Sequence, residues 1–156
     1  MTVHYDMAIN AEGWQNEETL RRLVDSVLQA TLQELGFDKI DSELSLVFTN
    51  DADIREINGK WRHIDKPTNV LSFPAFALQP GQEPGEILGD IVIARETVAR
   101  EAAEEHKSFD DHLSHLVVHG LLHLMGYDHQ NDEEAEQMET LERKILASLG
   151  ISDPYL

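Results

Sequence analysis

The spacing of hydrophobic residues changes along this chain from a period of two to a period of about 3.6. Alternating or short apolar runs predict four strands, of which the first is an edge strand, at residues 5–9, 43–49, 70–73 and 89–94. Helical spacing predicts five helices, at residues 17–35, 51–59, 96–106, 110–125 and 132–149. Asn16 and Gly36 are suited to begin and end the first helix, and Asp51 to cap the second.

The order of these elements predicts the fold class. Strands dominate the first half and helices gather at the end, which is typical of an α+β domain. We expect a small mixed β-sheet of about four strands packed with helices, in a single domain over residues 1–156. Residues 75–87 contain Pro80-Gly81 and Pro84-Gly85, so they are expected to form a turn-rich loop.

The composition narrows the class of protein. Hydrophobic residues make up 41% of the 156 residues, which is enough for a folded core, and there is no cysteine for disulfides or thiolate metal sites. The first residues lack a basic segment followed by an apolar core, and no apolar run approaches the roughly 20 residues of a membrane span. These features predict a cytoplasmic protein with no membrane partner.

The distribution of charge along the chain limits which partners the protein can bind. The formal net charge of −18 argues against nonspecific binding to nucleic acid, whose phosphates are neutralised by lysine and arginine. Much of the acid lies in residues 101–105 and 132–139, which are predicted to be solvated helix faces. Four cations share one short segment and are compatible with a basic groove on an acidic body: Arg55, Lys60, Arg62 and Lys66.

Three histidines, two in the fourth helical segment and one just beyond it, have the spacing of a metal site. His119 and His123 are four residues apart, so on a helix they project about 40° apart and can share a metal. Gly126 allows the helix to stop, after which the chain can fold back to bring in His129. Three protein ligands leave one coordination position open, which suits catalysis better than structure. Asp128, beside the third ligand, could orient an imidazole or hold a water.

One residue separates this motif from the peptidases that share its spacing. The pattern matches the His-x-x-x-His-x-x-Gly-x-x-His frame of the metzincins, and the helix is therefore zincin-like. Zincins carry a glutamate after the first histidine as general base for peptide hydrolysis. Here that position is Gly120, whose expected role is close packing of the helix against a neighbour. A peptidase with the usual mechanism is therefore disfavoured.

A second dense segment runs from Trp61 to Pro74. Arg62 could hold a phosphate or stabilise developing negative charge, because its planar fork binds oxyanions at two points. Lys66 is a second candidate for substrate binding. Taken alone, the segment favours a surface loop whose charges are solvated over a phosphate-binding site.

Together, the two segments resemble the YbeY family of bacterial endoribonucleases, also called rRNA maturation factors. The resemblance spans essentially the whole chain, and Asn69, where many members have Asp, is a mild departure. The matching runs are Asp65-Lys66-Pro67-Thr68-Asn69-Val70-Leu71-Ser72-Phe73-Pro74, Leu88-Gly89-Asp90-Ile91 and His119-Gly120-Leu121-Leu122-His123-Leu124-Met125-Gly126-Tyr127-Asp128-His129.

The resemblance implies a single-strand-specific, metal-dependent endoribonuclease in ribosomal RNA processing and ribosome quality control. It implies one Zn²⁺ per chain bound by His119, His123 and His129, with Arg62 near the metal. The implied partners are ribosomal RNA, the small ribosomal subunit and ribosome-assembly proteins. His119 and Arg62 are then the candidate catalytic residues, and Arg62 and Lys66 the candidate substrate-binding residues.

Three questions stay open at the level of sequence. The proton acceptor could be a hydroxide at the metal, Asp128, another histidine or the RNA 2′-hydroxyl. A peptidase or amidase on a zincin-like frame is one alternative function. The other is a non-catalytic ribosome-assembly factor whose metal is structural.

Overall fold

The protein is built on a four-stranded mixed sheet. The computed structural model describes residues 2–37 and 41–156. The strand order is β1 (Thr2–Ile9), β2 (Asp41–Thr49), β4 (Ile87–Ala94), β3 (Val70–Pro74), with β3 antiparallel to β4 and the other pairs parallel. The described helices are α1 (Glu17–Leu35), α2 (Asp51–Arg62), α3 (Arg95–Glu104), α4 (Phe109–Leu124) and α5 (Asp132–Ser148). The predicted α+β class, the mixed sheet and the edge position of β1 are confirmed.

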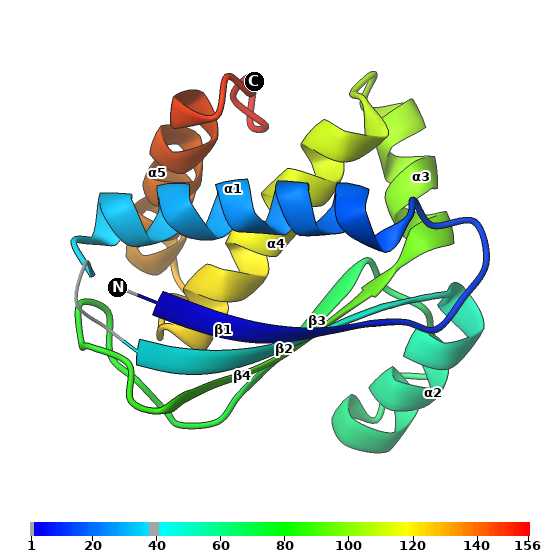
Figure 1. Ribbon diagram of the computed structural model, residues 1–156, viewed down its shortest axis with the longest axis horizontal. Coiled ribbons are helices and arrows are strands. Elements are labelled where there is room, and N and C mark those ends of the chain that lie inside the picture. Colours follow the sequence, from blue (N-terminus) through cyan, green and yellow to red (C-terminus); the bar gives the residue numbers. More distant parts are fainter. Residues whose placement is uncertain (1, 38–40) are drawn as a thin grey trace.

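Helices cover the two faces of the sheet unequally. α1, α3, α4 and α5 lie on one face, and α2 lies on the other (Figure 1). The larger core is formed by the alternating residues of β2, including Leu46 and Phe48, with buried residues of α1, α4 and α5. A smaller core joins Ile54 of α2 to Leu71, Val92 and Ala94 on the opposite face. The helix that carries the histidine motif therefore packs against the middle of the molecule.

The first helix begins and ends at the predicted residues. The Asn16 side chain accepts a hydrogen bond from the backbone N–H of Thr19, and Gly36 has a φ of 75°. Each satisfies backbone groups that a helix end leaves without a partner. None of the helices within the described residues has the length and hydropathy of a membrane span.

The second helix differs from the prediction at both ends. Asn50, not Asp51, caps it, because the Asn50 side chain accepts from the backbone N–H of Asp53 at 2.8 Å. Asp51 instead accepts from the backbone N–H and the hydroxyl of Thr97 at the start of α3. The helix also continues through Gly59 to Arg62, since a glycine weakens a helix by about 1 kcal/mol but does not stop it. Arg62 consequently lies on the last turn of a helix.

Candidate metal centre and cleft

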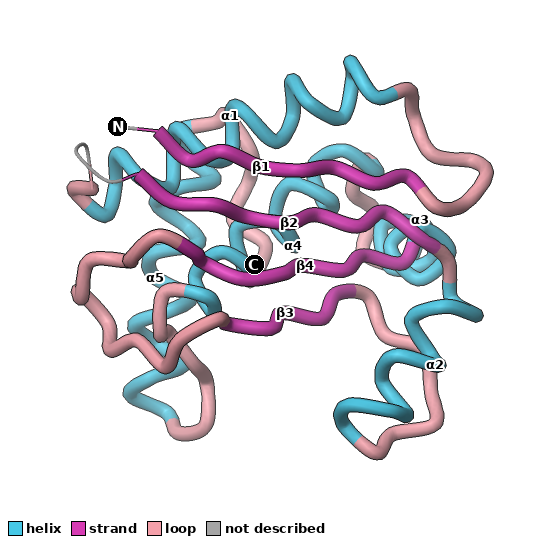
Figure 2. The backbone as a smooth tube through the Cα atoms, turned by 60° about the horizontal axis from the view of Figure 1, so that its bottom comes forward, coloured by secondary structure: helices cyan, strands magenta, loops and turns pink. Residues whose placement is uncertain are grey.

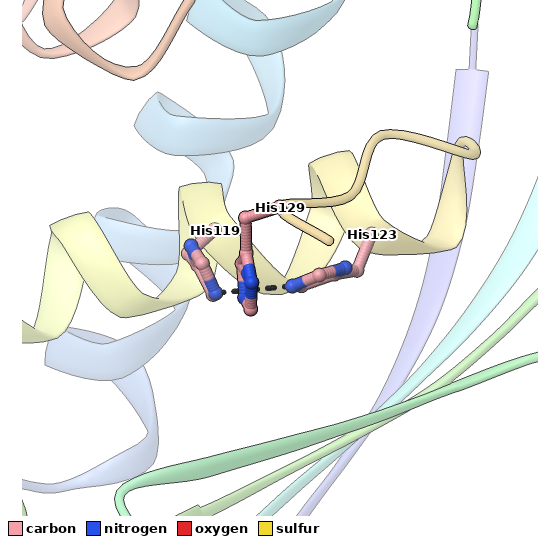
Figure 3. Close-up of side chains that lie close together, drawn as sticks. All are labelled: His119, His123 and His129. Atoms are coloured by element: carbon pink, nitrogen blue, oxygen red, sulfur yellow. Dashed lines mark hydrogen bonds between the residues drawn. The ribbon is translucent and has the colours of Figure 1, made fainter. Parts of the chain in front are cut away.

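Three imidazoles converge beside β3. His119 and His123 come from α4, and His129 comes from the loop between α4 and α5 (Figure 3). One nitrogen from each ring lies within 4.8 Å of the other two, and the Nε2 atoms of His119 and His123 are 3.1 Å apart. The structure thus brings together the three residues that the spacing singled out.

The donor set fits a metal ion. Burial and the neighbouring charges of His119 and His129 lower the pKa of His123 to about 4, so that its ring is neutral at pH 7 and its nitrogen lone pair is free. Three imidazoles on a half-buried surface are ligands that zinc and related transition metals prefer. Within the described residues, no further histidine or carboxylate completes the group, which leaves room for water or substrate.

The helix end that brings in His129 depends on Gly126. Gly126 has a φ of 97°, and the N–H groups of Gly126 and Tyr127 donate to the carbonyls of His123 and Leu122. A Cβ at Gly126 would lie 2.3 Å from the carbonyl oxygen of Leu78. Glycine therefore suits this position for two reasons. It adopts the positive φ that reverses the chain, and it has no Cβ to clash with the loop after β3.

Asp128 holds the chain around the third imidazole. Its carboxylate accepts from the backbone N–H of His129 at 2.8 Å, and Asp128 Oδ1 lies 4.0 Å from Nδ1 of His123. The side chain also lines the cleft described below. Its position is compatible with the orienting role expected from the sequence.

Gly120 packs closely, as predicted. A Cβ at this position would lie 3.1 Å from Cδ1 of Ile91 and 3.2 Å from Oγ of Ser72. Position 120 therefore faces β4 and β3 directly, and the space that a zincin glutamate would need is filled by the sheet.

A buried carboxylate that sequence reasoning missed supports the first histidine. Glu142 of α5 is 0% exposed, and it accepts a hydrogen bond from Nδ1 of His119 at 2.6 Å. The hydroxyl of Tyr155 donates to its other oxygen, and Nε2 of His115 lies 3.5 Å from Oε1. Because Nδ1 of His119 carries the hydrogen, Nε2 is left to face His123. The available signal was an acidic residue on the apolar stripe of α5, between Met138 and Ile145.

The pKa of Glu142 reflects these contacts. Burial alone would raise it, but hydrogen bonds from His115, His119 and Tyr155 outweigh burial and lower the pKa to about 2. The carboxylate is consequently ionised at neutral pH and can hold an imidazole hydrogen.

The C-terminal segment is fixed in place at this carboxylate. The backbone N–H of Tyr155 donates to Asp153, whose carboxylate pairs with Arg143 of α5. The Arg143 guanidinium also lies 5.3 Å from the centre of the Tyr155 ring. These contacts hold the Tyr155 hydroxyl against Glu142, the carboxylate that contacts Nδ1 of His119.

The histidines open onto a cleft of about 660 Å³, which also contains Asp128. Arg62 lines the same cleft, and its guanidinium donates to the carbonyl of Ser72 at 2.9 Å. Among residues 2–37 and 41–156, no other hydrogen bond engages this guanidinium, so its remaining donors can contact a ligand. Further lining residues come from the segment 68–78, and they include Thr68, Asn69, Val70, Leu71, Ser72, Pro74, Phe76, Ala77 and Leu78.

Of the four clustered cations, the cleft receives one. Lys66 is exposed and is not among the residues that line the cleft. Arg55 is paired with Asp65 through two hydrogen bonds of 2.7 and 3.1 Å, and Lys60 lies over the Trp61 ring. The basic cluster of the sequence therefore does not become a basic groove, and Arg62 is the one of these four cations that shares the cleft lining with the histidines.

The Asn69 side chain makes two hydrogen bonds within the protein. Its amide nitrogen donates to Glu101 of α3 at 2.9 Å, and its oxygen accepts from the backbone N–H of Val70. A carboxylate there would face Glu101 directly, so asparagine suits this position electrostatically.

Comparison with known proteins agrees with this architecture. The family model described as "Endoribonuclease YbeY" matches residues 7–150. A protein named endoribonuclease YbeY from Agrobacterium fabrum is 61% identical, covering 96% of this chain and 92% of the relative. Another of that name, from Bartonella bacilliformis, is 52% identical, covering 98% of this chain and 97% of the relative.

A solved structure shares the fold. The solution structure of TM1509 from Thermotoga maritima superposes with a TM-score of 0.58 at 25% identity, covering 93% of this chain and 92% of that one. The family match over most of the sequence, the identities of the relatives and the three converging histidines lead to one assignment. The chain belongs to the YbeY endoribonuclease family.

Proposed function

We propose that this protein is a single-strand-specific, metal-dependent endoribonuclease that acts in ribosomal RNA processing and ribosome quality control. Ribosomal RNA and the small ribosomal subunit are its proposed partners, with ribosome-assembly proteins, and the cytoplasm is its proposed place of action. The observation that carries the proposal is the convergence of three imidazole nitrogens within 4.8 Å on the cleft that Arg62 lines. The name shared by the relatives supports the reaction class.

The proposed ligands are His119, His123 and His129, and the proposed metal is one Zn²⁺ per chain. When bound, such a metal supplies Lewis-acid chemistry, which polarises a phosphate oxygen and lowers the pKa of water. Glu142 holds Nδ1 of His119, so this histidine offers Nε2 in a set direction. His119 contributes to catalysis as a ligand of this kind.

Arg62 is proposed to bind the scissile phosphate. Its bond to the Ser72 carbonyl and its position 5.4 Å from the Phe73 ring restrain the guanidinium before substrate arrives. A restrained cation can stabilise charge in the transition state without reorganising at the moment of reaction. Lys66, which lies outside the cleft lining, is proposed only as a contact for more distant phosphates.

Metal analysis combined with cleavage of a single-stranded RNA tests this function. We expect His123→Ala to lose both zinc and cleavage, and Arg62→Ala to keep zinc while cleavage falls roughly 100-fold or more. His4→Ala is the matched control, because His4 is exposed and pairs with Asp41 at the opposite edge of the sheet. Wild-type cleavage rates in His123→Ala, with contaminating metal excluded, would rule out the proposed site.

A further inference from the structure

Exposed apolar side chains gather around the cleft. Three of the large exposed hydrophobic residues in the described chain fall between positions 61 and 76: Trp61 at 63%, Ile64 at 49% and Phe76 at 60% exposure. Ile64 and Phe76 line the cleft, and Trp61 directly precedes Arg62 on the last turn of α2. Single exposed apolar residues are ordinary, but a group of them at one cleft indicates a surface that binds something.

The two segments that carry these residues are attached to opposite ends of β3. α2 and the turn after it lead into Val70, and the loop with Phe76 follows Pro74 (Figure 2). β3 has β4 on one side only, so its other edge borders the cleft. An extended ligand lying along this edge would pass from Ile64 to Phe76 and cross the histidines.

Apart from the proposed metal, the cleft lining offers phosphates little positive charge. Arg62 is the lining cation, and Asp128 brings a negative charge to the same cleft. The formal net charge of −18 adds a repulsive background for any nucleic acid. A polyanionic substrate therefore needs a source of affinity other than its phosphates.

Resting on the proposed function, we infer that Phe76, in the cleft lining, forms a stacking subsite for the unpaired bases of single-stranded RNA, and that Trp61, outside that lining on the helix before β3, offers a second ring. Every base has a π-face that can stack on an exposed aromatic ring, whatever its sequence. In a duplex those faces are covered by neighbouring bases, so such a subsite selects single strands. Arg62 then needs to bind only the phosphate beside the histidines.

The subsite is tested by removing the aromatic ring from the protein and the bases from the RNA probe, first separately and then together. The probes are a fluorescent adenosine oligonucleotide, 2′-O-methylated to limit cleavage, and the same oligonucleotide with abasic positions. We expect the wild-type protein to prefer the probe with bases by roughly 5- to 100-fold, as for the loss of one or more stacked bases. Phe76→Ala should abolish most of this preference, and Trp61→Ala part of it.

Matched variants separate stacking from general apolarity. Phe76→Tyr keeps the ring and should keep the preference, whereas Phe76→Leu keeps the apolar volume and should lose it. Ile9→Ala removes an exposed apolar side chain from β1, at the far edge of the sheet, and should bind like wild type. Unchanged base preference in Phe76→Ala would overturn the inference. So would RNA binding that is unaffected while binding of a ribosomal protein is lost, because the surface would then be a protein contact.

Salt dependence gives an independent measurement. For single strands, the slope of log affinity against log salt is about −0.7 for each neutralised phosphate, so one to three contacts predict roughly −0.7 to −2. A slope of about −4 or steeper would mean six or more phosphate contacts. Binding would then be carried by the backbone, and the stacking subsite would be rejected.

The inference and the proposed function can fail separately. Wild-type protein that cleaves RNA while Phe76→Ala behaves normally removes the stacking subsite alone. Base-dependent binding without any cleavage removes the nuclease and leaves the subsite. A protein that binds neither probe and cleaves no RNA overturns both.

Discussion

At the scale of single residues, the buried carboxylate of Glu142 determines how His119 faces the cleft. A charge with no solvent access is costly unless it is paired and hydrogen-bonded. Here both oxygens are occupied, one by His119 and one by Tyr155. Because the carboxylate is fixed from behind, the imidazole cannot turn its Nε2 away from His123 without breaking a buried contact.

Removing the Tyr155 hydroxyl should weaken metal binding. In Tyr155→Phe, Oε2 of Glu142 loses its donor, and His115, whose Nε2 lies 3.5 Å from Oε1, is the other donor beside the carboxylate. The carboxylate is then expected to turn toward His115 and loosen its hold on His119. We expect the zinc dissociation constant to rise roughly 10-fold, as for other outer partners of metal ligands. Competition with a chromophoric chelator measures it.

Tyr5→Phe is the matched control for that change. Tyr5 also donates to a carboxylate, that of Asp25, but on the surface of α1 away from the histidines. It should bind zinc like wild type. Equal zinc affinities in wild type and Tyr155→Phe would show that Tyr155 has only a structural role at the chain end.

Glu142 should also leave a signature in acid. Its pKa in the folded metal-free protein is about 2, below the ordinary 4.5, so its stabilising contribution is complete above pH 4.5 and is lost as pH falls toward 2. The full loss is on the order of 3 kcal/mol of unfolding free energy. Urea unfolding between about pH 6 and pH 3 should show Glu142→Gln losing less stability than wild type. Parallel curves for the two proteins would contradict this account.

At the scale of elements, the end of α4 is what converts two helical histidines into a group of three. The helix stops at Leu124, Gly126 reverses the chain, and His129 returns to the same face.

The free edge of β3 is protected against pairing with a further strand. The Arg62 side chain occupies the Ser72 carbonyl, the Asn69 side chain occupies the Val70 N–H, and Pro74 has no N–H to offer. These contacts limit pairing of the free edge with another strand.

Two glycine substitutions should separate conformation from crowding at helix ends. Gly36 and Gly126 both have positive φ, but only Gly126 has backbone atoms where a Cβ would lie. Gly36→Ala should cost about 1–2 kcal/mol from conformation alone, and Gly126→Ala roughly 2–5 kcal/mol. Gly126→Ala should in addition weaken zinc binding, since His129 would be displaced. Equal losses of stability in the two variants, measured by urea unfolding, would contradict the close approach of Leu78.

Element boundaries show where local sequence is insufficient. The first helix was predictable to the residue because Asn16 and Gly36 act on their own helix. The second was not, because Asp51 is used by α3 and the helix runs through Gly59. A residue such as Asp51, whose side chain binds a helix distant in sequence, cannot be recognised as doing so from its neighbours in the chain.

At the scale of the whole molecule, the proposed metal site lies at the margin of a core that does not depend on it. The larger core is formed by apolar residues of the sheet, α1, α4 and α5, and none of the three histidines belongs to it. The fold should therefore persist without metal. This separates the proposed catalytic site from one in which a metal holds the structure together.

Metal removal should leave the fold intact and abolish activity. After chelation we expect an unchanged far-ultraviolet circular dichroism spectrum and no RNA cleavage. Zinc at 100 times its dissociation constant should then raise the unfolding free energy by about 2.7 kcal/mol. His129→Ala should not show this rise. A protein that unfolds on chelation would instead support a structural metal.

The sequence by itself determined the fold class, most of the elements and the histidine group, because each is encoded in short-range spacing. Periods of two and 3.6 residues, a helical pair four apart and a glycine at the helix end are properties of local backbone geometry. The role of Gly120 in close packing was predictable for the same reason, as an absent side chain where zincins have glutamate.

Only the tertiary structure decided what surrounds the histidines. Glu142 and Tyr155 lie 23 and 36 residues beyond His119, and they reach it because α5 and the C-terminal segment fold back on α4. The same folding brought Arg62 into the cleft, left Lys66 outside its lining and paired Arg55 with Asp65. Charges and hydrogen-bond partners are chosen by proximity in space, and sequence distance carries little information about that proximity.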